Sequence, residues 1–172
     1  MSLETYNKKR DFEHTPEPEG EGAVQTSKLV FVVQRHQASH LHFDFRLEAD
    51  GVLKSWAVPK GPSMNPSDKR LAVMVEDHPL EYANFKGLIP EGNYGAGIVE
   101  IWDSGYWIPA ENFHEVGKAL EDGMLEFVLK GKKLKGKFAL IKLKKSTVKD
   151  GWLLVKKKDE YAISTLYDAN KK

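Results

Sequence analysis

The residues best suited to chemistry lie in the segment HLHFDFRLE, at residues 40–48. Imidazole and charged side chains alternate there with large apolar ones. Because side chains two residues apart on a β-strand lie on the same face, His42, Asp44 and Arg46 would share one face, opposite the phenylalanines that enter a core. The plainer interpretation is an amphipathic strand whose polar face is only solvated.

A second histidine makes a metal site possible. His36 lies six residues before His42, and a bend between them would bring both imidazoles to Asp44. Two imidazoles and a carboxylate form a three-point site for a divalent first-row metal, and three protein ligands leave positions open for water and substrate. Manganese, zinc, iron and cobalt all accept these ligands. His40 lies two residues before His42 and would share its face of the strand, so His40 is the alternative to His36 as the second imidazole ligand.

Arginines next to such a metal suggest a phosphorylated substrate. Arg70 and Glu76 share a parity on the expected strand RLAVMVE, and His78 follows it directly. A guanidinium group can donate two parallel hydrogen bonds to two oxygens of one phosphate, and its charge stabilises an anionic transition state. A histidine such as His78 can protonate the departing oxygen, while Glu76 would orient an arginine or a ligand imidazole. The set predicts metal-dependent phosphoester hydrolysis, with His78, Arg46, Arg70 and Glu76 at the reacting phosphate.

Two rival classes remain open. One is a non-haem iron oxygenase, since an HxD pair with a distant histidine also forms a facial triad. The other is a non-catalytic nucleic-acid-binding β-barrel with histidines on its polar face. Oxygen consumption would identify the first, and DNA binding that chelators do not change would identify the second.

Composition limits the class of protein. The 172 residues are enough for one domain, and the absence of cysteine excludes disulfides and thiolate zinc sites. There is no apolar run of about 20 residues and no signal-peptide pattern at the N-terminus. We therefore expect a soluble cytoplasmic protein without membrane contact.

The charge is unevenly distributed. The net charge is +1, but twelve lysines and a single acid, Asp150, lie between Lys130 and Lys158. Such a basic stretch favours polyanions such as nucleic acid. Lysines that protect exposed strand edges are an equal alternative.

The periodicity predicts short strands separated by turns. A mainly β fold follows, with one or two short helices and its strands in an antiparallel barrel or sandwich; of these we expect the compact antiparallel β-barrel, which the family resemblance given below implies. Residues 1–27 are expected to form a flexible, extended N-terminal arm, 28–160 the barrel domain and 161–172 a C-terminal tail. A turn is expected at 103–105 and a helix at 111–122. The expected strands are residues 29–34, 41–48, 52–58, 70–76, 98–103, 106–109, 125–130, 137–144 and 152–157.

Longer motifs add a family resemblance. The segments FVVQRHQASHLHFDFRLEADGVLKSWAVPKGPS and KRLAVMVEDHPLEYANFKGLIPEGNYGAGIVEIWD resemble the 3′-phosphoesterase domain of bacterial DNA ligase D, the ligase of non-homologous end joining. The similarity runs from about Tyr6 to Lys158. It implies a β-barrel with the site in a crescent groove. Because no ligase or polymerase module is attached in these residues, the chain is similar to the stand-alone form.

The resemblance also implies an activity in DNA repair. Members of the family heal DNA 3′ ends in primer-templates that carry a terminal ribonucleotide or a 3′-phosphate. A phosphodiesterase step removes the terminal nucleoside, and a phosphomonoesterase step then removes the phosphate to leave a 3′-OH. The implied cofactor is Mn²⁺, with Co²⁺, Zn²⁺ or another divalent metal as replacements. A separate DNA ligase and polymerase would act on the same ends, and the protein is expected to be a monomer.

The family's site residues match this sequence position by position. An N-terminal RDF-x-x-T-x-EP element matches RDFEHTPEP, which gives the arm a functional role if it orders over bound substrate. The implied metal ligands are His36, His42 and Asp44. The implied phosphate-binding and catalytic groups are Arg46, Arg70, His78, Tyr82 of the monoesterase step, Lys60 of a loop, and Arg10, Asp11 and Glu17 of the arm.

Overall fold

The computed structural model describes residues 3–20, 28–110 and 116–171. Two short α-helices, one 3₁₀ helix and nine strands make up its regular structure. In chain order they are α1 (Leu3–Lys8), β1 (Val30–Gln37), β2 (Leu41–Ala49), β3 (Val52–Val58), β4 (Lys69–His78), η1 (Leu80–Asn84), β5 (Gly87–Ile89), β6 (Gly97–Pro109), α2 (Val116–Asp122), β7 (Met124–Gly131), β8 (Lys135–Lys142) and β9 (Gly151–Lys156).

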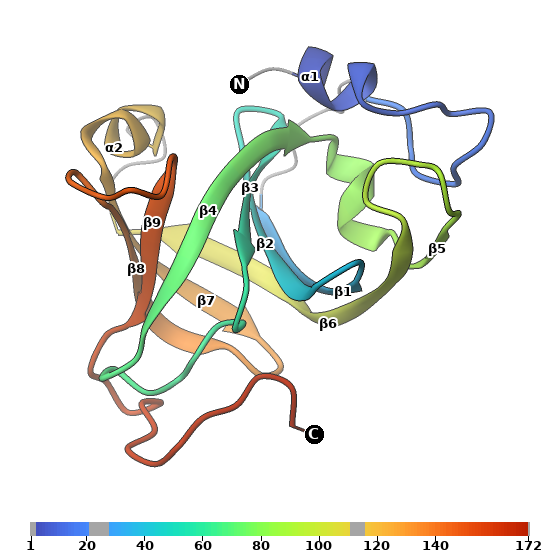
Figure 1. The fold of residues 1–172 in the computed structure, drawn as a ribbon. Helices are drawn as coiled ribbons and strands as arrows, with labels where there is room; N and C mark the ends of the chain where they lie inside the picture. Colours follow the sequence, from blue (N-terminus) through green and yellow to red (C-terminus); the bar gives the residue numbers. More distant parts are fainter. Residues whose placement is uncertain (1–2, 21–27, 111–115, 172) are drawn as a thin grey trace.

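Eight strands close into an antiparallel barrel (Figure 1). The order around it is β1-β2-β3-β4-β9-β8-β7-β6, and β6 pairs back with β1. The ninth strand, β5, pairs only with the first residues of β6. The mainly β, antiparallel barrel predicted from the sequence is confirmed.

One predicted turn is wrong. The sequence DSG at 103–105 does not end a strand, because β6 runs on through it, paired with β1 as far as Tyr106 and with β7 from Gly105 onward. A Cβ on Gly105 would lie 2.1 Å from the carbonyl oxygen of Lys130, so the glycine permits a close approach of two backbones rather than a reversal. Of the helix predicted at 111–122, residues 116–122 are helical, and 111–115 lie outside the described residues.

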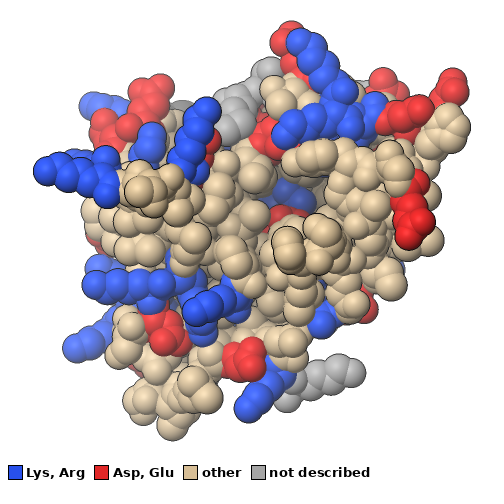
Figure 2. Space-filling view, viewed as in Figure 1, with Lys and Arg blue, Asp and Glu red and all other residues tan. Residues whose placement is uncertain are grey.

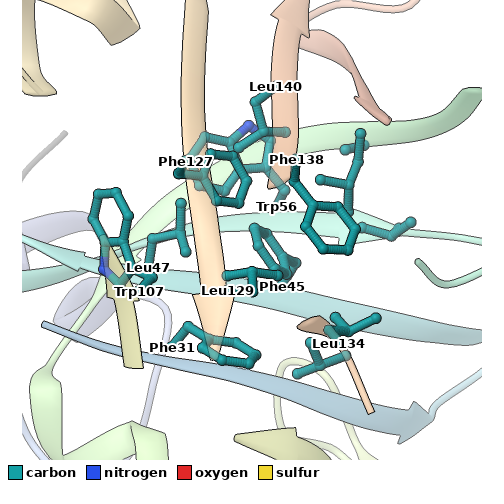
Figure 3. Close-up of a cluster of buried hydrophobic side chains, with 14 of the residues drawn as sticks. Phe31, Phe45, Leu47, Trp56, Trp107, Phe127, Leu129, Leu134, Phe138 and Leu140 are labelled. Carbon is teal, nitrogen blue, oxygen red and sulfur yellow. The ribbon is translucent and has the colours of Figure 1, made fainter. Parts of the chain in front are cut away.

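Aromatic side chains fill the barrel (Figure 3). Trp56 and Phe45 are fully buried with ring centroids 6.3 Å apart, and the rings of Phe127 and Phe138 stack at 6.2 Å. Burying each such ring contributes roughly 2–3 kcal/mol. The apolar face of β2 supplies Phe43, Phe45 and Leu47 to this core, as its alternation predicted, whereas Leu41 at the start of the strand, which the same alternation placed in the core, is exposed.

Asp103 fixes the β7–β8 turn. Its buried carboxylate accepts backbone N–H groups from Lys132, Lys133 and Leu134 at 2.9, 3.2 and 2.8 Å. Asp103→Ala would leave these donors without their acceptor, so we expect the free energy of unfolding to fall by about 2–4 kcal/mol. Urea unfolding measures the loss. Asp122→Ala, an exposed position on α2, is the control, and equal stabilities for the two variants would contradict this role.

The N-terminal residues 3–20 are not an extended arm. They contain α1, and they pack near the end of β4 (Figure 1). Tyr6 is fully buried in a second apolar cluster with Leu53, Tyr82 and Ile89. The composition of the segment did not show this, because the burial depends on residues more than 40 positions away. We refer below to residues 3–20 as the arm.

Lysines are prominent on the β8–β9 side and on the arm, with acidic side chains among them (Figure 2). Lys156 is the buried exception, since its ammonium group pairs with Asp159 at 2.6 Å and donates to backbone carbonyls. Within the described part of the chain, no helix is long and apolar enough to cross a membrane.

Candidate active site

A cavity of about 330 Å³ opens between the arm and the outer face of the barrel. In Figure 2, charged side chains lie deep in a hollow whose rim is largely uncharged. Strands β1 and β2, the end of β4, η1 and the loop before β6 contribute to its wall. The predicted site residues among its lining are Arg10, Glu17, His36, His42, Asp44, Arg46, Glu76, His78 and Tyr82.

The three predicted metal ligands converge. His36 and His42 are direct partners in the β1–β2 register, so their side chains lie on one face, with ring centroids 4.8 Å apart. Asp44 is the next residue on that face of β2. One ligand atom from each of the three lies within 4.8 Å of the others.

Backbone carbonyls orient both imidazoles. Nε2 of His36 donates to the carbonyl oxygen of Gly95 at 2.7 Å, and Nδ1 of His42 donates to that of His40 at 3.1 Å. The other nitrogen of each ring is therefore unprotonated in the neutral form and faces Asp44, at 3.5 Å for His36 and 3.3 Å for His42. Ligand imidazoles in metalloproteins are oriented in this way, so the residues fit a divalent metal. The exposed side chain of His40 is not part of the group.

Charge keeps Asp44 ionised. Burial raises the pKa of its carboxyl, but the Arg46 guanidinium and the neighbouring imidazole rings of His36 and His42 outweigh burial and hold that pKa far below its usual range. For His42, burial lowers the pKa, yet the carboxylate of Asp44 raises it overall. A buried carboxylate that stays charged is suited to bind a cation.

Arg46 carries an unsatisfied donor. Its Nε donates to Oε1 of Gln34 at 2.7 Å, Nη2 lies 3.5 Å from Asp44, and the guanidinium lies over the ring of Tyr82. The remaining nitrogen, Nη1, is buried and has no hydrogen-bond partner among the described residues. A buried N–H without an acceptor is costly, and an anionic ligand in the cavity would satisfy it.

A bulge turns His78 into the site. Val75 pairs with Ser55 and His78 pairs with Leu53, so β4 advances three residues where β3 advances two, and the register shifts by one residue. Residues three apart would normally lie on opposite faces, but the extra residue places His78 opposite Leu53, on the face that carries Arg46. The predicted neighbourhood of His78 and Arg46 thus depends on an irregularity that the alternation pattern does not reveal.

His78 is neutral at physiological pH. Burial, followed by the charges of Arg46 and Arg10, lowers the pKa of its ring well below the ordinary value. Nδ1 donates to the carbonyl oxygen of Glu76 at 2.9 Å, so Nε2 is unprotonated and accepts from Nη2 of Arg10 at 3.3 Å.

This lowered pKa predicts acid sensitivity. Below about pH 6.5 an unfolded chain protonates this histidine while the folded protein does not, so stability falls as the pH falls. We expect urea unfolding to show about 1 kcal/mol lost between pH 7 and 5.5 that His78→Gln does not lose. His40→Gln, at an exposed position, should retain the wild-type pH dependence. An unchanged dependence in His78→Gln would contradict the assignment.

The arm supplies Arg10 to the cavity. Nε of Arg10 lies 2.9 Å from Glu17, and Nη1 lies 3.4 Å from Glu76. Tyr82 donates its hydroxyl to the same carboxylate of Glu17 at 2.7 Å. These contacts join the arm, β4 and η1 around one guanidinium, and Glu76 orients an arginine, one of the two roles expected for it.

Sequence reasoning missed Gln34. This fully buried residue of β1 accepts from Arg46 and donates to the carbonyl oxygens of Tyr82 and Phe85 at 2.8 and 3.0 Å. It therefore fixes Arg46 to η1. The two-residue period of a strand could have indicated it, because Gln34 lies two residues before His36 and therefore shares its face of β1.

Three predicted residues lie elsewhere. Lys60 and Arg70 line a second cavity, of about 470 Å³, at the other end of β4. Arg70 and His78 are eight positions apart in the sequence, which is about 26 Å of strand. Arg70 instead donates to the carbonyl oxygen of Tyr167 at 2.8 Å. Asp11 is exposed and pairs with His14 rather than with a cavity residue.

This placement predicts a small catalytic effect for Arg70. Because Arg70 cannot reach a phosphate at His78, we expect Arg70→Ala to change kcat on a short substrate by less than about fivefold, against 100-fold or more for a phosphate-binding arginine. Steady-state kinetics on one substrate under identical conditions measure the difference. A drop in kcat as large as that of Arg46→Ala would show that the two ends of β4 act on one phosphate.

Comparison with known proteins agrees with the resemblance. A family model described as the DNA Ligase D 3′-phosphoesterase domain matches residues 34–142. The multifunctional non-homologous end joining protein LigD of Pseudomonas aeruginosa is 53% identical over 164 residues, which cover 94% of this chain and 19% of that protein. The corresponding DNA repair protein LigD of Mycobacterium tuberculosis is 45% identical over 164 residues, covering 92% of this chain and 20% of that protein.

The chain thus spans about one fifth of the length of these relatives. The matched region contains the candidate metal ligands His36, His42 and Asp44 together with Arg46 and His78, and the longer alignments cover more than nine tenths of the chain. A match of this extent, together with the barrel, assigns the chain to the DNA ligase D 3′-phosphoesterase domain family.

Proposed function

We propose that this protein is a metal-dependent phosphoesterase that heals DNA 3′ ends. It removes a 3′-terminal ribonucleoside as a phosphodiesterase and then the 3′-phosphate as a phosphomonoesterase, which leaves a 3′-OH for ligation. The observation that carries this proposal is the convergence of His36, His42 and Asp44 beside the unsatisfied Nη1 of Arg46. A cation site next to a free guanidinium N–H suits a phosphoester.

His36, His42 and Asp44 would hold the metal. Mn²⁺ is the proposed cofactor, because an ion of this kind accepts both imidazole and carboxylate ligands; Co²⁺ and Zn²⁺ are possible replacements. When bound, the ion offsets phosphate charge and polarises the phosphorus–oxygen bond.

The arginines hold the phosphate. Arg46 lines the cavity and its Nη1 has no partner among the described residues, and Arg10, fixed by Glu17 and Glu76, lies 3.3 Å from Nε2 of His78. Their two positive charges stabilise the anionic transition state. The Tyr82 ring lies below the Arg46 guanidinium, with 4.9 Å between Cζ and the ring centroid, and supports its position.

His78 is the proposed proton donor to the departing oxygen. In the free protein Nε2 has no proton, because burial, followed by the charges of Arg46 and Arg10, lowers the pKa of the ring. A bound phosphoester offsets those charges and raises the pKa of the ring, so Nε2 can take a proton and pass it on. Water is the nucleophile in this scheme.

The names of the relatives support DNA ends as the substrate. Both LigD proteins are described by their role in non-homologous end joining, and we propose that this chain acts on primer-template ends in the same kind of repair. The two arginines favour this over an iron oxygenase, and the oriented imidazoles favour it over a purely binding barrel.

The test uses a primer-template ending in a single 3′ ribonucleotide. The protein is incubated with Mn²⁺, with or without EDTA, and the ends are resolved on a gel. We expect a shortened 3′-phosphate product followed by a 3′-OH product, both absent with EDTA. DNA binding without any product would favour the binding barrel, and consumption of oxygen would favour the oxygenase.

A further inference from the structure

We propose that Tyr94 positions the nucleic-acid end: its ring packs against the base of the nucleotide whose 3′ oxygen carries the scissile phosphate. This inference rests on the proposed function and identifies what holds the part of the substrate that the charged groups do not contact. That nucleotide is common to both esterase steps, so a single contact would serve both.

The cavity has two kinds of surface. Charged groups, among them Asp44, Arg46 and His78, provide one part, and the apolar side chains of Val75 and Ile89 provide another. A free phosphate ion would use only the charged part. A phosphate attached to a flat, weakly polar body would use both, and a nucleotide has this chemistry.

Tyr94 is the lining residue best placed to meet that body. Its side chain is 52% exposed although it lines the cavity, whereas the neighbouring ring of Tyr82 is 3% exposed and its hydroxyl pairs with Glu17. A half-exposed aromatic ring next to a phosphate site is the usual platform for a nucleobase, because every base presents a π-face.

The ring is also held in place. The ammonium group of Lys9 lies 4.7 Å from the ring centroid of Tyr94 and 3.4 Å from its hydroxyl, and the same ammonium pairs with Glu76 at 3.1 Å. The next residue, Gly95, accepts the hydrogen bond that orients His36. Tyr94 is thus tied to both the phosphate-binding side and the metal-ligand side of the cavity, which lowers the cost of binding.

A different role would give different results. If Tyr94 served only to hold Lys9 and the arm, its removal would affect every substrate equally. The test therefore compares two primers with a 3′-phosphate, one with a normal terminal base and one whose terminal nucleotide is abasic. Binding is measured by fluorescence anisotropy in EDTA, and phosphate release is measured separately with Mn²⁺.

For the normal primer, we expect Tyr94→Ala to weaken binding by about 5- to 50-fold, while Tyr94→Phe stays within about twofold because it keeps the ring. For the abasic primer, wild type and Tyr94→Ala should bind equally. Tyr106→Ala, which removes a 46% exposed tyrosine that lines another cavity, is the matched control and should leave both affinities unchanged.

Two results would overturn the inference. Equal weakening of both primers would mean that Tyr94 only supports the arm, and no weakening of either would mean that its ring does not meet the base. If wild type releases no phosphate from the normal primer, the proposed function fails instead, and the binding comparison still decides the role of Tyr94.

Discussion

Replacing His42 with alanine is expected to abolish metal-dependent trimming of DNA 3′ ends, with at least a 1000-fold loss of rate. Nε2 of His42 faces Asp44 at 3.3 Å, and its removal leaves two of the three proposed ligands. Removing even a residue that supports a metal ligand costs about 10- to 100-fold, so loss of a ligand should cost more. The measurement is single-turnover product formation with Mn²⁺.

Two further measurements make this result specific. Titration of Mn²⁺ followed by electron paramagnetic resonance should show metal binding at least about tenfold weaker in His42→Ala than in wild type. His40→Ala is the matched control, because its exposed side chain lies two residues away and only its backbone carbonyl contacts His42. If His40→Ala loses activity while His42→Ala keeps it, the ligand assignment is wrong.

Replacing Arg46 with lysine or glutamine should lower kcat by about 100-fold or more, equivalent to about 2.7 kcal/mol of transition-state stabilisation. Lysine retains the charge but lacks the planar fork, so it cannot contact Gln34, Asp44 and a phosphate together. Because Arg46 is not a metal ligand, Mn²⁺ affinity should change much less than kcat. Steady-state kinetics and metal titration of the same samples measure the two effects.

The control for Arg46 is Arg35→Lys. Arg35 lies on β1 between Gln34 and His36, so its side chain is on the face opposite the candidate site. It contacts Asn170 and Glu100 there. We expect wild-type kcat for this variant. Comparable losses in the two variants would indicate a general need for positive charge rather than a specific contact of Arg46 with the phosphate.

Part of the site was predictable because it depends on local geometry. Strand alternation places His42, Asp44 and Arg46 on one face of β2 wherever that strand lies. His36 joins them because a short hairpin pairs β1 with β2 and makes His36 the direct partner of His42. Short strands and frequent turns indicate an antiparallel barrel or sandwich, and the family resemblance selects the barrel, although β6 shows that a DSG sequence does not always reverse the chain.

Other parts depend on contacts between distant segments. The plainer interpretation of β2, a polar face that is only solvated, is wrong, because Asp44, Arg46 and Glu48 are buried. The arm and η1 help to cover this face, and neither leaves a signal in the sequence of β2. The β4 bulge likewise depends on pairing with β3, and it alone turns His78 toward Arg46.

From the sequence alone one can therefore predict that His42, Asp44 and Arg46 share one face of β2 and that His36 can join them, because a two-residue period acts over a few positions. Only the tertiary structure decides that Arg10 meets Glu76 across 66 residues and that Arg70 lies at the far end of the strand that carries His78. The reason is physical. Strand alternation decides on which face of a strand a side chain lies, and it acts locally. Packing between distant segments decides which part of that face is covered and enclosed, and therefore where the cavity forms.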